Sequence, residues 1–341
     1  MPLRRLTWKG DDEFQYEEHC QPPPSPGPWE VTLQVKAVGV CSTDLHILSG
    51  SFPLAHPPLV LGHEIAGEII DVGEEVSRVR PGDRVTVDQV VGCGECYFCR
   101  RGSRQFCPQG YELGMTRDGG CQDLLMLPEE NAYPIAESIT FEEAAILDME
   151  VWGALAKCGV RPDDTALVVG HGPAGLVACQ ILRALGARKV ILCGRSLARL
   201  ERAGALGVAD RIVSSGDGFL DVVKAETDGL GVDIAFECSG TPSGVESAIA
   251  AAKPGGRVVV YGVQAGPLDG FDLNQILLKD LVVYGTLSDR RGWEEVIDLV
   301  SRGELALGPL ITHRFPLHRA QEAYQLVRSR AEGVIKAVLM L

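Results

Sequence analysis

The hydrophobic pattern of the chain changes near residue 150, which indicates two kinds of architecture. Before that point, apolar and polar residues alternate in short segments that turns interrupt. Residues 31–38 alternate and are rich in β-branched side chains, which predicts a strand. The turn Pro81-Gly82-Asp83 precedes a predicted strand at 84–87, and the proline-rich residues 22–28 form a predicted surface loop. The first part of the chain is therefore expected to be rich in short strands.

After residue 150, continuous apolar runs alternate with segments of helical period. Such runs are typical of strands buried on both faces, and their alternation with helices predicts a parallel, doubly wound sheet. Strands are expected at 166–169, 189–193, 211–213, 232–236, 257–261 and 281–284, and helices at 174–185 and 197–205. A predicted helix at 292–302 and a strand at 334–339 are expected to rejoin the first domain. We therefore expect an α/β chain in which residues 1–150 and 287–341 form one domain and 151–286 an inserted second domain.

Length and charge narrow the classes of function. The 341 residues are enough for two domains, and 45% hydrophobic against 23% charged residues is ordinary for a soluble globular protein. The net charge of −14 argues against nucleic acid and anionic membranes as main partners. The start of the chain lacks an apolar core of signal-peptide type, and no apolar run of about 18 residues occurs. We therefore expect a cytoplasmic protein that does not span a membrane.

Four of the 11 cysteines form a compact run, with two residues between each of the first three. Such a loop can wrap four thiolates around one Zn²⁺ in a closed tetrahedron. A disulfide interpretation needs an oxidising compartment, which nothing in the sequence suggests. The expected ligands of this structural zinc are Cys93, Cys96, Cys99 and Cys107.

The segment GHGPAG at 170–175 fits the dinucleotide-binding pattern G-x-G-x-x-G. The pattern alone is weak, but here it follows a predicted buried strand and opens a predicted helix, which is the required context. The glycines allow a tight turn, a close approach of backbone to the pyrophosphate and close packing of helix on strand, and the helix N-terminus meets the phosphate charge. The expected cofactor contacts in this loop are Gly170, Gly172, Pro173, Ala174 and Gly175.

The end of the second strand bears on the choice of cofactor. An NAD site usually has Asp or Glu there to bind the ribose 2′-hydroxyl, but this chain has Gly194, followed by Arg195 and Ser196, with Arg199 one turn on. A guanidinium without a neighbouring carboxylate suits a dianionic 2′-phosphate. We therefore expect binding at these residues with NADP preferred and NAD possible; the alternative is that Arg195 is an ordinary solvated side chain.

Cys41, His63 and Glu64 offer S, N and O ligands of the kinds that Zn²⁺ accepts. Taken separately, a lone cysteine is usually a core residue and a lone histidine is more often hydrogen-bonded than metal-bound. Their presence beside a four-cysteine loop and a dinucleotide fold favours a second, catalytic metal site.

With these segments, the chain resembles the zinc-dependent medium-chain dehydrogenases, and within them the sorbitol, threonine and related polyol dehydrogenases. The motifs that carry the resemblance run nearly from end to end: GVCSTD at 39–44, LGHE at 61–64 through Gly73, PGDRV at 81–85, the cysteine loop, and EEAA at 142–145. The resemblance implies a GroES-like, β-rich catalytic domain and a Rossmann domain. It also implies that Cys41 and His63 bind the catalytic zinc, with Glu64 as a third or exchangeable ligand.

In relatives, a Cys or Glu shortly before the nucleotide domain approaches the same metal, and alignment on EEAA puts Asp148 there. The polyol branch usually reads Glu-Pro at this point, whereas this chain reads Asp148-Met149-Glu150. Glu150 could take the place of Asp148 as ligand, or a water could bridge from Asp148.

The expected chemistry combines the metal with the cofactor. Zinc acts as a Lewis acid that lowers the pKa of a substrate alcohol, so that an alkoxide forms near neutrality and hydride passes to nicotinamide. Thr43 stands where relatives carry a hydroxyl that touches the alcohol, and His46 could carry the proton to solvent. Asp44 is left out of the catalytic set, because helix capping explains it equally well.

The leading hypothesis is therefore a zinc-dependent secondary alcohol or polyol dehydrogenase that prefers NADP. The alternatives are an NAD-dependent enzyme for an amino alcohol such as threonine and a catalytically silent nucleotide-binding relative. The apolar strand at 281–284 would lie at the edge of the sheet in the usual strand order. An apolar edge invites pairing with a second copy, so we expect a homodimer or homotetramer.

Overall fold

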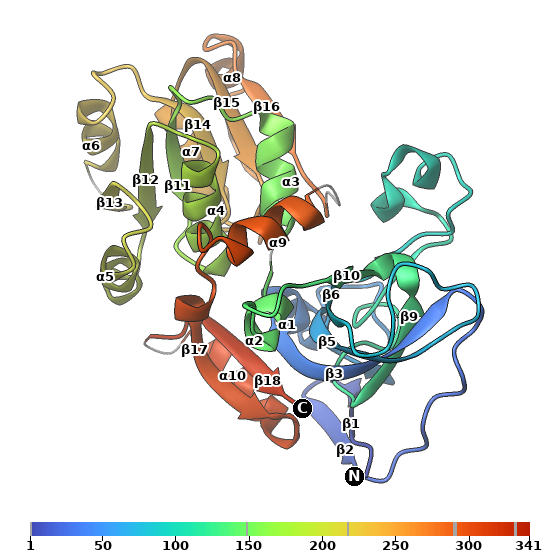
Figure 1. The fold of residues 1–341 in the computed structure, drawn as a ribbon. Coiled ribbons are helices and arrows are strands. Elements are labelled where there is room, and N and C mark those ends of the chain that lie inside the picture. The colour runs from blue at the N-terminus through green and yellow to red at the C-terminus, as the bar shows by residue number, and fades with distance from the viewer. Residues whose placement is uncertain (1, 148, 217, 289–291, 331–332) are drawn as a thin grey trace. The chain divides into compact units, whose positions relative to one another are not determined.

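The computed structural model describes residues 2–147, 149–216, 218–288, 292–330 and 333–341 (Figure 1). The chain divides into two compact units. Unit 1 consists of Met1–Leu147, Trp293–Ser301 and Leu307–Leu341, and unit 2 of Asp148–Gly292 and Arg302–Ala306. Two stretches near the C-terminus thus return to the unit in which the chain began.

Unit 1 is built on a sheet with the path β10-β6-β5-β3-β18-β17, and β9 also pairs with β3. The long strand β3 lies at the centre and pairs antiparallel with β5, β9 and β18, so it joins the start of the chain to its end. The strands are β3 (Glu30–Val40), β5 (Glu64–Val72), β6 (Arg84–Val87), β9 (Leu124–Pro128), β10 (Ala132–Pro134), β17 (Ile311–Pro316) and β18 (Lys336–Met340).

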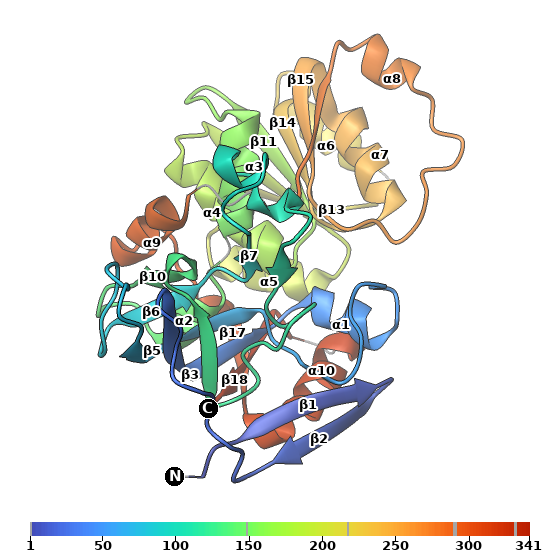
Figure 2. The same cartoon turned by 90° about the vertical axis from the view of Figure 1, so that its right-hand side faces the viewer.

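Smaller elements surround this sheet. A hairpin of β1 (Arg5–Gly10) and β2 (Glu13–Glu17) pairs with β4 (Leu59–Val60), and β7 (Val90–Val91) pairs with β8 (Tyr111–Glu112). The helices of unit 1 are α1 (Ser42–Leu48), α2 (Phe141–Ala145), α9 (Trp293–Ser301) and α10 (Ala320–Ser329). The hairpin lies beside α10 (Figure 2). The Phe14 ring of the hairpin stacks on the buried Tyr324 of α10, with 5.4 Å between the ring centroids.

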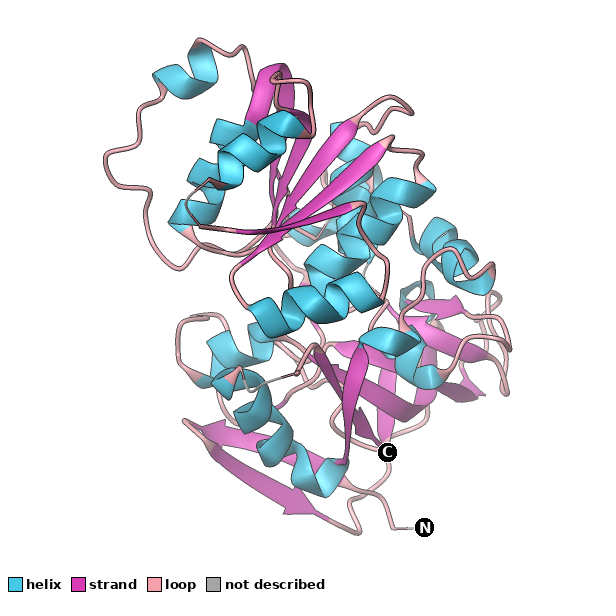
Figure 3. Cartoon of the chain, turned by 90° about the vertical axis from the view of Figure 1, so that its left-hand side faces the viewer, coloured by secondary structure: helices cyan, strands magenta, loops and turns pink. Residues whose placement is uncertain are grey.

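Unit 2 is a parallel sheet with helices on both faces (Figure 3). Within the described residues the sheet has six strands in the order β13-β12-β11-β14-β15-β16. The strands are β11 (Thr165–Val169), β12 (Lys189–Gly194), β13 (Arg211–Ser214), β14 (Val232–Glu237), β15 (Ala252–Val260) and β16 (Val282–Gly285). The helices are α3 (Met149–Cys158), α4 (Pro173–Ala184), α5 (Leu197–Ala205), α6 (Phe219–Ala225), α7 (Pro242–Ala251) and α8 (Asn274–Leu277). This confirms the predicted α/β, doubly wound architecture.

The continuous apolar runs predicted the strands of unit 2 well, because the residues of the inner strands are buried almost without interruption. Every residue of β11 is buried, as expected for a strand covered on both faces. In unit 1, β9 alternates between half-buried and buried residues, which is the pattern of an antiparallel strand with one face on the core. Among the described residues, no helix has the length and apolar character needed to cross a membrane.

Candidate zinc and dinucleotide sites

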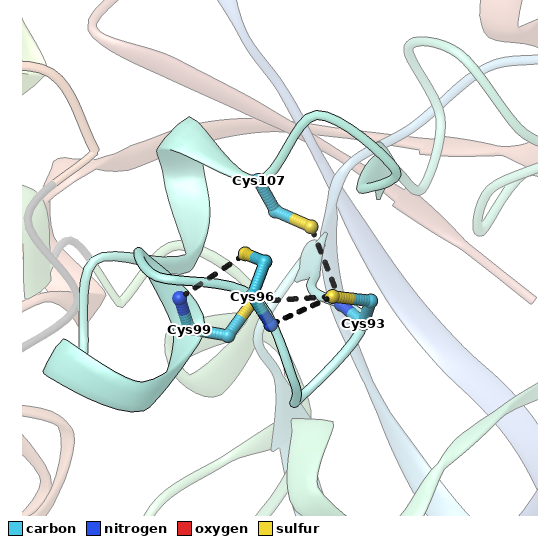
Figure 4. A group of neighbouring side chains, drawn as sticks. All are labelled: Cys93, Cys96, Cys99 and Cys107. Carbon is cyan, nitrogen blue, oxygen red and sulfur yellow. Dashed lines mark hydrogen bonds between the residues drawn. The ribbon is translucent and has the colours of Figure 1, made fainter.

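The four clustered cysteines converge in the connection between β7 and β8, which contains two short 3-10 helices. The sulfur atoms of Cys93, Cys96, Cys99 and Cys107 all lie within 4.8 Å of one another (Figure 4). Four sulfurs about 2.3 Å from one zinc ion, in a tetrahedron, would be roughly 3.8 Å apart. The arrangement therefore fits the expected structural metal.

Backbone N–H groups of the same loop donate to its sulfur atoms. The amides of Cys93, Cys96 and Cys99 each lie 3.4 Å from the sulfur of Cys107, Cys93 and Cys96, respectively. The bond from the Cys99 amide lowers the pKa of Cys96, whereas burial raises the pKa of Cys99 to about 12. Because a thiol binds metal as thiolate, loading this loop releases protons, and the loop amides help to hold the resulting negative charge.

A second group of possible ligands lies where β3 ends and β5 begins. Cys41 follows β3 and is the N-cap residue of α1, His63 precedes β5, and Glu64 is its first residue. Their ligand atoms lie within 4.8 Å of one another. The antiparallel pairing of β3 with β5 brings these segments together, since it places Gly39 opposite Glu64.

Asp44, which sequence reasoning left as a helix cap, links two members of this group. Its Oδ2 accepts the amide of Cys41 at 2.9 Å, so the capping role is real. Its Oδ1 lies 3.3 Å from His63 Nδ1, and the Asp44 side chain is fully buried. This places a carboxylate on the Nδ1 side of the imidazole and leaves Nε2 for a metal, as is usual for metal-binding histidines. The capping-box spacing was the signal, but it did not reveal the contact with His63.

The electrostatics of the group favour a cation. Burial alone would lower the pKa of His63, but the Asp44 carboxylate and Cys41 together raise it well above its ordinary value. Glu64 Oε2 is buried and has no hydrogen-bond partner among the described residues. An environment that favours positive charge, with an unpaired carboxylate oxygen, fits a divalent metal ion.

Glu64 has a partner that sequence reasoning missed. The buried Lys336 of β18 donates to Glu64 Oε1 at 2.6 Å. Gly39 makes this contact possible, because a Cβ atom there would collide with Glu64 Oε2. A lysine in the apolar segment 334–339 was the available signal, since a buried ammonium group needs a partner.

The other residues expected at this site have the following positions. Thr43 Oγ1 lies 3.7 Å from the sulfur of Cys41, and His46 Nδ1 lies 3.3 Å from Ser51 Oγ at the far end of α1. Asp148 lies outside the described residues. Glu150, the alternative ligand, is in the first turn of α3 in unit 2.

The glycine-rich loop has the geometry that a pyrophosphate needs. Gly170 adopts a φ of +129°, which strains any other residue. A Cβ atom at Gly175 would collide with the carbonyl oxygen of Gly170, whereas one at Gly172 would meet nothing within 4 Å among the described residues. Gly172 is the N-cap residue of α4 and Pro173 follows in the first turn, before Ala174. The loop therefore packs tightly at Gly175 and leaves space beside Gly172 at the N-terminus of α4, which fits a bound phosphate.

The turn after β12 carries the residues expected near the adenosine ribose. Gly194 ends the strand and is buried, while Arg195 and Ser196 are exposed. Ser196 is the N-cap residue of α5, and its hydroxyl accepts the amide of Arg199 at 3.5 Å. One residue of the glycine-rich loop that was not singled out, His171, also contacts this turn: its Nε2 accepts the amide of Ser196 at 3.0 Å.

Comparisons with known proteins found similarity in both units of the chain. The chain matches the family model of the alcohol dehydrogenase GroES-like domain over residues 27–137 and that of zinc-binding dehydrogenases over residues 173–302. It is 36% identical over 331 residues to L-threonine 3-dehydrogenase from Pyrococcus abyssi, with 93% of each chain covered.

Two solved structures are similar over nearly the whole chain. One is an alcohol dehydrogenase from Escherichia coli complexed with NADH (TM-score 0.91, 29% identity, 100% of this chain and 99% of that one). The other is a zinc-binding dehydrogenase from Sinorhizobium meliloti bound to NADP (TM-score 0.90, 28% identity, 100% of both chains).

Proposed function

Because the chain belongs to the zinc-dependent medium-chain alcohol dehydrogenases, we propose that it oxidises a secondary alcohol, of the polyol or sugar type, with NADP preferred over NAD. Membership of the family makes it an oxidoreductase that acts on alcohols. The observation that carries the proposal is the grouping of Cys41, His63 and Glu64 around a point where positive charge is favoured.

The proposal assigns two zinc ions to each chain. Cys93, Cys96, Cys99 and Cys107 would hold the structural ion, and Cys41, His63 and Glu64 the catalytic ion, with Asp148 as the expected further ligand. A zinc ion held by the second set supplies Lewis acidity toward the alcohol oxygen, and a bound nicotinamide dinucleotide supplies the hydride acceptor.

The residues around Cys41 would orient the alcohol and remove its proton. Asp44 Oδ1 lies 3.3 Å from His63 Nδ1, so the carboxylate would help to keep the ring in one orientation. The Thr43 hydroxyl, beside the Cys41 sulfur, can accept a proton from the substrate hydroxyl while donating its own. His46 lies one turn further along α1, near Ser51, and can pass that proton to solvent.

The dinucleotide would bind unit 2 at the glycine-rich loop and the turn after β12. Gly172 leaves room for the pyrophosphate at the N-terminus of α4, and Arg195 offers a guanidinium where a 2′-phosphate would need one. The expected domains are 1–150 with 287–341 and 151–286. The compact units change at Leu147 and Trp293 instead, and Arg302–Ala306, which was expected in the first domain, belongs to unit 2. We also propose that the protein is cytoplasmic and forms a homodimer or homotetramer.

A threonine-type amino alcohol is the second candidate substrate, because the curated relative described above is an L-threonine 3-dehydrogenase. Initial rates with a panel of polyols, sugars, simple secondary alcohols and L-threonine, each with NAD and with NADP, separate the two. A kcat/KM for L-threonine with NAD above that of every polyol with NADP would replace the leading proposal. No turnover of any alcohol, with only one zinc ion per chain, would indicate a catalytically silent relative.

A further inference from the structure

The imidazole of His171 joins the two loops that would surround the dinucleotide. β11 and β12 are parallel neighbours, with Val169 opposite Cys193, and the amide of Gly170 donates to the Cys193 carbonyl at 2.9 Å. The segments that follow these strands are therefore adjacent. His171 crosses between them, and its Nε2 accepts the Ser196 amide at 3.0 Å.

The same ring covers Gly194. A Cβ atom at position 194 would lie 2.5 Å from Cγ and 2.8 Å from Nδ1 of His171. These distances are far below van der Waals contact, and the imidazole is a rigid ring close to its own backbone, so it cannot yield without changing rotamer. Position 194 therefore has no room for any side chain while His171 keeps its place.

This steric relationship concerns the choice between the two nicotinamide dinucleotides. The end of the second strand is where NAD enzymes place the carboxylate that binds the ribose 2′-hydroxyl and repels a 2′-phosphate. Here that place is closed to an acid, and the residue that closes it also holds the turn that carries Arg195. His171 Nε2 accepts the Ser196 amide, so the ring serves as a hydrogen-bond acceptor for that turn.

We propose that His171 is a specificity-determining residue for the cofactor: it excludes a carboxylate from position 194 and fixes the Arg195–Ser196 turn for a 2′-phosphate. The proposal rests on the preference for NADP proposed above. It predicts that an acid at position 194 does not by itself reverse the cofactor preference.

The experiment measures dissociation constants for NADPH and NADH by nicotinamide fluorescence, with thermal melting to confirm folding. Gly194→Ala adds the Cβ atom without charge, so it should weaken both cofactors by about tenfold and to a similar degree. Combined with His171→Ala, the same change should cost less than about threefold relative to His171→Ala alone. Gly216→Ala is the matched control, because a Cβ atom there meets nothing within 4 Å of the described residues, and it should change neither constant.

The second part of the experiment tests cofactor preference by placing an acid at position 194. Gly194→Asp alone should weaken both cofactors, whereas Gly194→Asp with His171→Ala should bind NADH more tightly than NADPH. His171→Ala alone should lower the NADPH-to-NADH preference about threefold, since one hydrogen bond that orders the turn is lost, and His171→Gln, which keeps an acceptor, should lower it less. A ratio of two constants does not change merely because a variant is less stable.

Two results would overturn the inference: a Gly194→Asp variant that prefers NADH as strongly as the double variant, or effects at 171 and 194 that simply multiply. The failure of the proposed function has a different signature. If the unmodified protein prefers NADH, the proposed NADP preference is wrong. The coupling between positions 171 and 194 is a separate result, which the His171→Ala and Gly194→Ala variants and their combination measure in either case.

Discussion

Lys336 and Glu64 meet across the strand that separates them. Glu64 begins β5 and Lys336 begins β18, and both strands pair with β3 on its opposite sides. Gly39 of β3 lies opposite Glu64 and has no side chain, so the glutamate passes over it to accept the lysine ammonium group at 2.6 Å. Oε1 of Glu64 is thereby paired with the ammonium group. Oε2 has no hydrogen-bond partner among the described residues, so it stays available to a metal.

Removing this lysine should destabilise unit 1. Lys336→Met leaves a mostly buried carboxylate without its partner, and breaking such a pair costs roughly 3 kcal/mol. Urea unfolding of the chelator-treated protein should show that loss, and Lys336→Met with Glu64→Gln should recover most of it. If the double variant is no more stable than the single one, the lysine acts through packing rather than through charge.

The catalytic metal assignment predicts a separation of chemistry from cofactor binding. Cys41→Ser or His63→Ala should abolish turnover and reduce zinc from two ions per chain to one, because these side chains are the proposed ligands. The affinity for NADPH should stay within about threefold, because the dinucleotide loops belong to unit 2. His56→Ala, at an exposed histidine outside both metal groups, is the control. Near-normal turnover in either ligand variant would remove the assignment.

Loss of a ligand of the proposed structural zinc should lower stability before it lowers turnover, which is the reverse of losing a catalytic ligand. Cys99→Ser should first lower the melting temperature and the zinc content, since a closed structural site contributes folding free energy. Calorimetry with metal analysis tests this, and Cys20→Ser, outside the cluster, should change neither quantity. A Cys99→Ser protein with two zinc ions and unchanged melting contradicts the structural site.

The guanidinium of Arg195 should matter for NADP alone. Arg195→Leu removes a charge-assisted contact of about 1.5–3 kcal/mol, so NADPH binding should weaken by about tenfold to a hundredfold while NADH binding changes little. Arg202→Leu, an exposed arginine further along α5, is the matched control. Equal losses for both cofactors would show that Arg195 supports the loop and not the 2′-phosphate.

The edge of the unit 2 sheet predicts self-association. In the described part of the chain β16 has a neighbour only on the β15 side, and Val282 and Val283 are 48% and 41% exposed. Pairing of this edge with a second copy would bury both. Light scattering at micromolar concentration should give a dimer or tetramer, which Val283→Lys should weaken and Leu230→Lys, at another exposed apolar position, should not. A monomeric unmodified protein contradicts the prediction.

The elements of unit 2 could be predicted closely because their signals are local. The helix expected at 197–205 matches α5, and the apolar runs mark six strands within one or two residues, except that β15 begins at Ala252 rather than 257. The early residues of β15 include Lys253, Pro254 and Gly255, which do not look like a buried strand, and the pairing register shifts there. These turn-forming residues hid the first part of β15 from sequence reasoning, although pairing with β14 keeps it in the sheet.

The partners of the site residues could not be predicted, because they depend on contacts distant in sequence. The three ligand types at 41, 63 and 64 were visible, but not the contact of Asp44 with His63 or of Lys336 with Glu64. Likewise, a glycine at 194 suggested a missing acid, while the ring of His171 that occupies its space became visible only in three dimensions. Short motifs indicate which chemistry is present, and tertiary packing determines how it is held.

The return of the chain to its first unit has a consequence for biosynthesis. Unit 2 is complete once Ala306 has left the ribosome, but the central strand β3 of unit 1 still lacks β18, one of its antiparallel partners. Lys336 reaches Glu64 from 272 positions away in sequence, so the nascent chain holds that carboxylate unpaired until Lys336 has emerged from the ribosome. Contacts of such separation form late and slowly. We therefore expect the proposed catalytic metal centre to mature later than the dinucleotide unit, which can fold as soon as its own residues have been synthesised.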